Sequence, residues 1–225
     1  MTRLMTAVLA LVALLCLAAA DVQAQTVADS VSEFSNFQGQ DGWYYGYYRR
    51  SGDSGGYDPN TDFRQLPQND PYAGTWSLDN TRFYTGMDAD QQHGNARVSS
   101  RDDVEHWAIR RWVSDVSGEF TISGMTREDR KVGNGDDGTI AKILLNGTEI
   151  FSRDIAPEDQ TALAYSLLAN LKVGDVVDFV MQPGVTDHYD CPFFTGTVSA
   201  VPEPTTFGLL TVGAVALAAR RRPRP

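Results

Sequence analysis

Cysteine is scarce in this 225-residue chain, which has two, at positions 16 and 191. Cys16 lies in an apolar N-terminal run that we expect to be removed, so the mature chain would keep Cys191 alone. A single cysteine excludes an intramolecular disulfide. Because Pro192-Phe193-Phe194 follows directly, we expect Cys191 to be a small buried apolar residue, with an intermolecular bridge as the alternative.

Histidine is almost as scarce, and His93, His106 and His188 do not stand in the spacing of a zinc site. The chain has 29 acidic residues. A glycosidase needs only two carboxyl groups, so the number of acidic residues does not exclude this activity. Small all-β modules more often bind than cut, an argument by analogy. The sequence therefore predicts a protein that is not an enzyme, with a polysaccharide-active hydrolase or lyase as the alternative.

Basic residues are in the minority, with 19 Lys and Arg against 29 Asp and Glu and a formal net charge of −10. A chain this acidic repels the phosphates of nucleic acids and anionic lipid surfaces. We therefore expect no nucleic-acid partner. We expect a solvated acidic surface that can also collect divalent cations.

Long apolar runs occur at the two ends of the chain, and the first belongs to residues 1–24. Arg3 supplies a positive start, an apolar stretch follows, and small residues precede a cleavage point between Ala24 and Gln25. This pattern predicts a signal peptide and export through Sec. A lipoprotein signal is rejected because Leu15, just before the cysteine, is large where a small residue is needed.

The second apolar run, Phe207–Ala219, lies between a Pro-Glu-Pro motif and a basic end. Two prolines fix φ and remove two backbone donors, so the motif stays extended and open to a protease. Residues 205–219 are shorter than the ~20 residues that span a membrane as a helix, which suits a temporary anchor. The motif is Pro202, Glu203 and Pro204, and the basic stop is Arg220, Arg221, Arg222 and Arg224.

These three parts, in this order, resemble the PEP-CTERM sorting tail of exopolysaccharide-producing Gram-negative bacteria. The resemblance implies a transient anchor in the inner membrane, cutting by an exosortase, and delivery to the cell surface or extracellular matrix. An ordinary unprocessed C-terminal anchor is the alternative. The expected organisation is a signal peptide at 1–24, one domain at 25–200 and the sorting tail at 201–225.

The central region alternates short β-type runs with Gly, Asn, Asp and Pro, as all-β sandwiches do. We expect a jelly-roll β-sandwich of eight to ten strands, with a signal helix and a short transmembrane helix outside it. Asn146-Gly147 between 139–145 and 148–153 predicts a type I′ hairpin, with apolar residues on both faces and hence internal to the sandwich. Residues 162–171 fit either a helix or a strand.

A weaker resemblance, to the carbohydrate-binding jelly-roll modules of secreted bacterial proteins, rests on turn and strand motifs. These motifs are Gly135-Asp136-Asp137-Gly138, Asn146-Gly147, Gly174-Asp175-Val176-Val177-Asp178-Phe179 and Tyr189-Asp190. The resemblance implies a sandwich fold and a carbohydrate ligand.

One run of the domain is dense in aromatic residues. Strand alternation puts Trp43, Tyr45 and Tyr47 on one face, and Tyr44 and Tyr48 on the other. One face must pack into the core, and the other exposes flat rings suited to stacking on a sugar. The alternative is that both faces are buried between the sheet and loops.

Trp107 and Trp112 also face opposite ways in a regular strand, so one belongs to the core and the other can sit under a loop or line a groove. The predicted carbohydrate contacts are Tyr44, Tyr45, Tyr47, Tyr48 and Trp107.

Acidic residues gather in two predicted loops, Asp136 and Asp137 in one and Asp187 and Asp190 in the other. Carboxylate oxygens on loops are ligands that Ca²⁺ prefers. If the two loops meet, they predict a calcium site. The alternative is that these residues form turns without an ion.

Taken together, the sequence predicts a secreted, surface-sorted protein that binds or structures exopolysaccharide. A purely structural matrix protein without a small ligand is a further alternative.

Overall fold

A computed structural model describes residues 24–50, 56–70, 74–79, 83–98, 104–129, 137–157, 159–187 and 192–201. Thr26–Ala200 forms one compact unit. Its described residues are strands and turns, with one short 3₁₀ segment at Gln40–Gly42. The predicted all-β class is therefore confirmed, whereas the signal helix, the C-terminal helix, the sorting motif and the basic stop lie outside the described residues. Among those residues, no helix is long and apolar enough to span a membrane.

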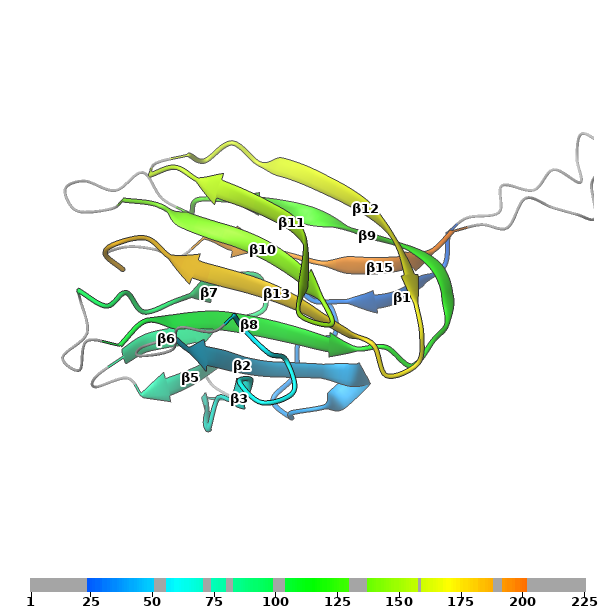
Figure 1. Ribbon diagram of the computed structural model, residues 1–225, viewed down its shortest axis with the longest axis horizontal. Coiled ribbons are helices and arrows are strands. Elements are labelled where there is room, and N and C mark those ends of the chain that lie inside the picture. Colours follow the sequence, from blue (N-terminus) through cyan, green and yellow to red (C-terminus); the bar gives the residue numbers. More distant parts are fainter. Residues whose placement is uncertain are drawn as a thin grey trace, which may run out of the picture. The chain divides into compact units, whose positions relative to one another are not determined.

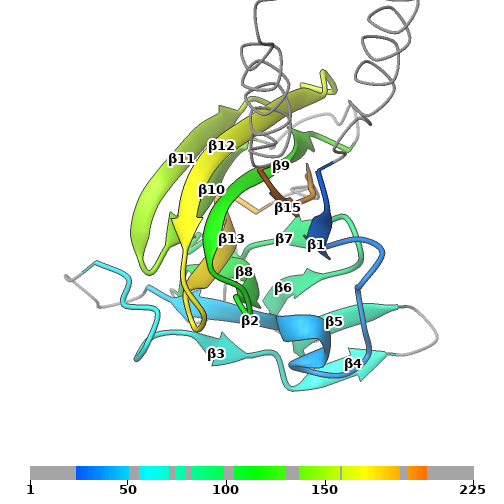
Figure 2. The same ribbon diagram turned by 90° about the vertical axis from the view of Figure 1, so that its right-hand side faces the viewer.

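Two antiparallel sheets make up most of the unit (Figures 1 and 2). The large sheet has the order β11 (Thr148–Ile155), β10 (Thr139–Leu145), β13 (Val176–Pro183), β8 (His106–Val113), β2 (Trp43–Arg49) and β3 (Arg64–Gln65). The small sheet has the order β1 (Thr26–Asp29), β15 (Thr197–Ala200), β9 (Gly118–Arg127) and β12 (Leu163–Leu171), with β14 (Phe193–Phe194) also on β9.

A third, side sheet has the order β4 (Gln68–Asp70), β5 (Thr75–Asp79), β6 (Phe83–Met87) and β7 (Gln92–His93). Trp76 of β5 stacks on Tyr45 of β2 with ring centroids 5.5 Å apart. The side sheet thereby joins the same core as the large sheet.

The core lies between the inner faces of the large and small sheets. The rings of Phe179 (β13) and Phe194 (β14) meet edge to face at 5.7 Å, and those of Phe151 (β11) and Tyr165 (β12) lie 5.0 Å apart. Gly196 has no room for a side chain against the Phe179 ring. These contacts across the two layers define a β-sandwich.

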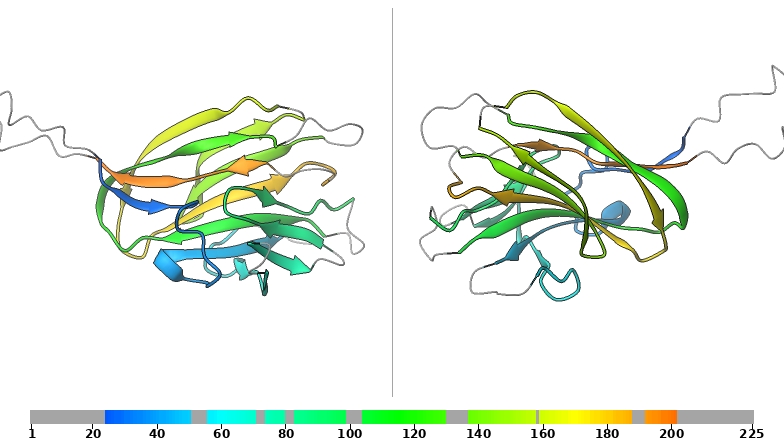
Figure 3. Two further views of the ribbon diagram at one scale, coloured as in Figure 1. Left: turned by 180° about the vertical axis from the view of Figure 1, so that it is seen from behind. Right: turned by 45° about the horizontal axis from the view of Figure 1, so that its top comes forward.

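Both ends of the compact unit lie at one end of the sandwich. Thr26 pairs with Ser199 in the β1–β15 ladder, and Ala200 pairs with Phe120 near the start of β9. The turns from β8 to β9 and from β12 to β13 lie at this same end, while β9 ends and β10 begins at the opposite end (Figures 1 and 3).

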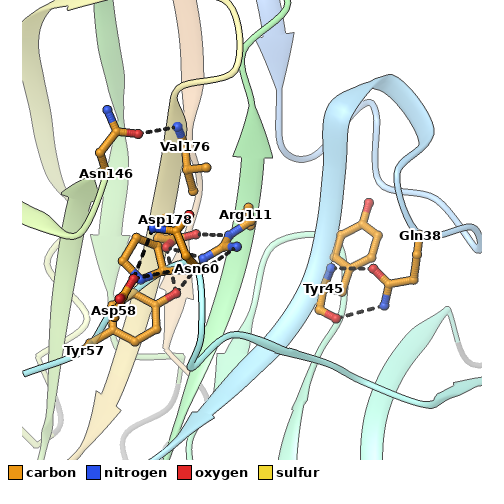
Figure 4. Close-up of polar contacts among 10 residues, drawn as sticks. Gln38, Tyr45, Tyr57, Asp58, Asn60, Arg111, Asn146, Val176 and Asp178 are labelled. Atoms are coloured by element: carbon orange, nitrogen blue, oxygen red, sulfur yellow. Dashed lines mark hydrogen bonds and ion pairs between the residues drawn. The ribbon is translucent and has the colours of Figure 1, made fainter.

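The predicted type I′ hairpin is confirmed, because Asn146 and Gly147 have φ of 51° and 82°. Val176 N–H donates to Asn146 Oδ1 at 2.9 Å, which fixes the turn on β13 (Figure 4). The expectation that the whole hairpin is internal was wrong. β10 is internal, but β11 forms an edge of the large sheet.

Residues 162–171, whose sequence fits either a helix or a strand, contain a strand. β12 pairs with β9 at all nine of its residues. Tyr165, Ala169 and Leu171 are buried, while the residues between them are half-buried or exposed. Pairing along the whole strand outweighs the helical preference of Ala and Leu, as tertiary context often does.

Candidate functional site

Residues 56–63 lie across the outer face of the large sheet. The ring of Tyr57 packs on Tyr48 at 5.2 Å, and Phe63 fills the space that a side chain at Gly46 would need. We call the resulting apolar group the outer cluster. It consists of buried Tyr48, Ile109, Leu144 and Val180 with half-buried Tyr57, Phe63 and Trp107.

A buried ion pair fixes this segment to the sheet (Figure 4). Arg111 of β8 donates from Nε and Nη2 to the two oxygens of Asp178 on β13, at 2.7 and 2.9 Å. The same guanidinium donates to Tyr57 Oη at 2.7 Å and to the Pro59 carbonyl at 3.0 Å. Its flat face lies 3.8 Å from the Phe63 ring centroid. Because the pair is bidentate and its groups are bonded to protein atoms, it is an anchor for the segment.

Burial raises the pKa of Asp178, while the hydrogen bonds and charge of Arg111 and the Tyr57 hydroxyl act in the opposite direction. Burial also raises the pKa of Tyr57, and the neighbouring Asp178 charge adds to it. The phenol therefore stays protonated and donates to Asp178 Oδ2 at 2.8 Å.

Trp107 stands at the margin of the outer cluster and remains half-buried. Its indole N–H donates to Glu105 Oε1 at 2.7 Å. Two cations lie near its ring, Arg50 at 5.6 Å and Lys142 at 5.3 Å from the centroid. An aromatic ring with charged groups over it can stack on a planar ligand when those groups move aside, and the groups can then hydrogen bond to the ligand's edge.

The charged groups around Trp107 also pair with acids. Arg50 contacts Glu105 at 3.0 Å, and Lys142 contacts Glu149 at 3.2 Å. Both pairs are partly exposed, so each is weak and can exchange partners.

The aromatic run turned out to be covered on both faces. Tyr45 and Tyr48 are 0% and 2% exposed, so their prediction as carbohydrate contacts was wrong. Tyr45 faces the core, where its hydroxyl accepts from Ser35 N–H at 3.0 Å. Tyr47 is half-buried beside His106, with the ring centroids 5.0 Å apart, and Tyr44 is half-buried over Gly39.

The opposed orientation of Trp107 and Trp112 is confirmed, since Trp112 belongs to the inner core and Trp107 to the outer cluster. Of the five predicted contacts, Trp107 is half-buried and has the cations of Arg50 and Lys142 over its ring. Sequence alternation could not reveal that residues 56–63 would cover Tyr48.

The two acidic loops do meet at Asp137. Its Oδ2 accepts from Val185 N–H at 2.6 Å, and its Oδ1 accepts from the N–H and hydroxyl of Thr186, each at 3.0 Å. Asp187 is buried beside His93, and burial lowers the pKa of that imidazole. Asp136 and Asp190 lie outside the described residues. Among those described, no three His, Cys, Asp or Glu side chains group as metal ligands would.

Sequence reasoning missed the two buried arginines. Arg110 points into the core, where it donates to the carbonyls of Phe194 at 3.2 Å and Asp88 at 2.7 Å. Burial lowers the pKa of Arg110 to about 10. Apolar residues on both faces of His106–Val113 were the available signal, because a strand buried on both faces buries both arginines.

One serine of the chain lies in a motif that is known from hydrolases. Residues 52–56, Gly-Asp-Ser-Gly-Gly, have Gly-X-Ser-X-Gly spacing, which in hydrolases stands between a strand and a helix. Residues 57–70 contain turns and the strands β3 and β4, so no helix follows the motif within that described stretch. Ser54 itself lies outside the described residues.

The strand pairing and the core define an all-β sandwich protein with a half-buried tryptophan on one outer face. Residues 200–222 match the family described as the PEP-CTERM protein-sorting motif. The chain therefore carries a PEP-CTERM sorting motif at its C-terminal end, as the sequence predicted. Such a motif implies export, exosortase processing and membrane-associated sorting to the cell surface. No curated protein matches this chain.

Three solved structures show a distant likeness to the chain. The chain is 14% identical to a structure of CBM51-2 in complex with GlcNAc and INT domains from Clostridium perfringens ZmpB, covering 50% of this chain and 26% of that one, with a TM-score of 0.35. It is 13% identical to a family 35 carbohydrate-binding module from Clostridium thermocellum, covering 56% and 87%, with a TM-score of 0.30. It is 10% identical to rabbit GITRL, covering 50% and 95%, with a TM-score of 0.29. Likenesses of this size do not define a shared fold, so the sandwich assignment rests on the strand pairing and the core.

Proposed function

We propose that this protein is a surface-sorted, non-enzymatic binder of exopolysaccharide. The observation that carries the proposal is Trp107, a half-buried indole on the outer face of the large sheet. The Arg50 and Lys142 cations lie over its ring, and Glu105 accepts from its N–H. Sorting to the surface brings the domain to the compartment where exopolysaccharide lies.

A sugar ring offers two kinds of contact, through its apolar C–H face and through its polar hydroxyl groups, and binding would use both. The indole face of Trp107 stacks on the C–H face of a sugar. Glu105 accepts hydrogen bonds from sugar hydroxyls, while Arg50 and Lys142 donate to ring and hydroxyl oxygens. The loose ion pairs of these side chains let them reorient toward a ligand.

A binding role fits the state of the carboxylates on this face better than catalysis does. Glu105, Glu149 and Asp178 each pair with a cation. A glycosidase needs one carboxylic acid of raised pKa and a second carboxylate across the scissile bond. Asp178, whose pKa burial raises, is 0% exposed and bonded to Arg111 and Tyr57, so a substrate cannot reach it.

We further propose that the sandwich is a jelly roll. Its support is the strand order, in which β1-β15-β9-β12 faces β8-β13-β10-β11. The chain crosses between the two sheets from β8 to β9, from β9 to β10, from β11 to β12 and from β12 to β13, as in paired Greek keys.

The proposed route is export through Sec in a Gram-negative host, brief anchoring in the inner membrane, and cutting near Pro202-Glu203-Pro204. Mass spectrometry of the protein taken from the host surface should show an N-terminus at Gln25 and a C-terminus near this motif. A surface form that still ends in Arg220–Pro225 would contradict the processing.

Polysaccharide binding is tested with the protein purified from the surface of an exporting host. Trp107→Ala should weaken co-sedimentation with the host exopolysaccharide about tenfold or more, a loss of roughly 1.4 kcal/mol. Phe37→Ala, which removes a ring that is 71% exposed elsewhere, is the matched control and should bind as the wild type does. Equal binding by both variants and wild type would contradict the site. No binding by the wild type would leave a structural matrix protein.

A further inference from the structure

The small sheet has one long open edge, formed by β12. One side of β12 pairs with β9 over Leu163–Leu171, and no described strand pairs with its other side. Alternate backbone N–H and C=O groups of an edge strand point away from the sheet. Such an edge is a template on which another strand can pair.

The sequence and length of β12 lack the features that usually protect an edge strand. Its sequence, Leu-Ala-Tyr-Ser-Leu-Leu-Ala-Asn-Leu, has no charged residue and no proline. Proteins commonly guard edges with charge, proline or short strands. The other edges here follow that rule, because β1 has four residues, β3 has two, and β11 carries Glu149, Arg153 and Asp154.

Apolar side chains on β12 are also exposed. Leu168 is 69% exposed and Leu163 is 43% exposed. In a chain with a net charge of −10, two copies repel one another over most of their surface. At an uncharged nine-residue edge the local part of this repulsion is small.

We propose that β12 pairs antiparallel with β12 of a second copy of this chain, about a two-fold axis at Leu167. In this register all nine residues overlap, with Leu163 opposite Leu171 of the partner. Tyr165 falls opposite Ala169 of the partner, so a large side chain meets a small one twice. The strand is thus complementary to itself, as a two-fold interface requires, and the two small sheets become one continuous sheet.

Disulfide trapping tests the register in the full chain as the exporting host produces it, with Cys16→Ser and Cys191→Ser as background. The pair Ser166→Cys and Leu168→Cys places each new thiol opposite the other type in the partner copy. Oxidation should therefore give a covalent dimer on non-reducing gels. The matched control is Ser152→Cys with Asp154→Cys, an exposed pair of the same spacing on the edge strand β11, which should form no covalent dimer on the same gels.

Sedimentation velocity tests association without cross-linking. Wild type and Ser152→Lys should sediment as dimers at concentrations where Leu168→Lys is monomeric, with a dissociation constant at least tenfold higher for Leu168→Lys. Thermal unfolding should show wild type and both variants folded, since Leu168 and Ser152 are exposed. The proposal is overturned if wild type stays monomeric without trapping, or if the β11 pair cross-links as readily as the β12 pair.

Discussion

Neighbouring arginines on β8 illustrate how one residue type takes two roles. Arg111 points outward and is neutralised by Asp178 in a bidentate pair. Arg110 points inward, and its described hydrogen bonds go to backbone carbonyls. A buried ion pair adds little net stability but is costly to break. We therefore interpret the Arg111 pair as the device that fixes where residues 56–63 lie.

His106 should make the protein sensitive to mild acid. Burial lowers the pKa of His106 to about 4, with the Arg49 and Arg64 charges adding to the shift. An unfolded imidazole takes up its proton near pH 6.5, so between pH 6.5 and 4 the unfolded state binds more protons. The free energy of unfolding should thus fall by about 3 kcal/mol as pH drops through this window.

Urea unfolding across this pH window, compared between wild type and His106→Gln, checks the prediction. In the variant, the free energy of unfolding should depend much less on pH. A smaller pH dependence should remain because burial also lowers the pKa of His93. An identical slope in both proteins would show that His106 protonates normally in the folded state.

At the scale of single elements, the turn at Asn146-Gly147 is where local sequence and fold agree most closely. Gly147 has φ of 82°, and a side chain there would also lie 2.8 Å from Pro59 Cδ. Gly147→Val should destabilise the domain by about 1–3 kcal/mol through backbone strain, and the contact with Pro59 should add to that cost.

Two control variants separate these causes. Gly174 has φ of 88° and open space around it, so Gly174→Val should show the strain alone. Gly56 has open space and no positive φ, so Gly56→Val should change stability least. Chemical unfolding should show the largest loss of stability for Gly147→Val, a smaller one for Gly174→Val and the smallest for Gly56→Val. Any other order would contradict the turn geometry.

The elements that sequence predicted well were those whose signal is local. Asn146-Gly147 defines its own turn, and alternation along His106–Val113 separates Trp107 from Trp112. The position of residues 56–63 depends on Arg111 and Asp178, which are 67 positions apart in sequence. No local pattern reports that contact, so the sequence could not tell that Tyr48 would be covered.

The acidic loops lead to a prediction about calcium. Because both oxygens of Asp137 accept from Val185 and Thr186, we interpret Asp137 as a turn-forming residue that joins two loops. Asp137→Asn should lower the free energy of unfolding by about 1–2 kcal/mol, since an acceptor of charge-assisted bonds is weakened.

Calcium is tested on the same proteins. The melting temperature of wild type should be the same in millimolar Ca²⁺ and in chelator. A rise with Ca²⁺ that Asp137→Asn abolishes would instead establish the calcium site that the sequence suggested, because a ion bound to the folded state alone stabilises it.

At the scale of the whole molecule, the sorting motif follows the sandwich directly in the chain. The motif matched at 200–222 implies sorting to the cell surface, and β15 ends at Ala200, the first residue of the match. Cutting near the motif would remove the arginines at 220–224 and leave a more acidic domain. Its charge would then keep it away from anionic membranes, so contact with the matrix would depend on particular side chains such as Trp107.

The four tryptophans allow the central claim to be tested directly. Trp43, Trp76 and Trp112 are buried in the core, and Trp107 is half-buried outside it. An ¹H–¹⁵N spectrum of the protein should show one indole N–H signal for each, with that of Trp107 assigned by its loss in Trp107→Phe. On addition of exopolysaccharide fragments, the Trp107 signal should shift while the other three stay in place. Binding that leaves the Trp107 signal unmoved would contradict the account.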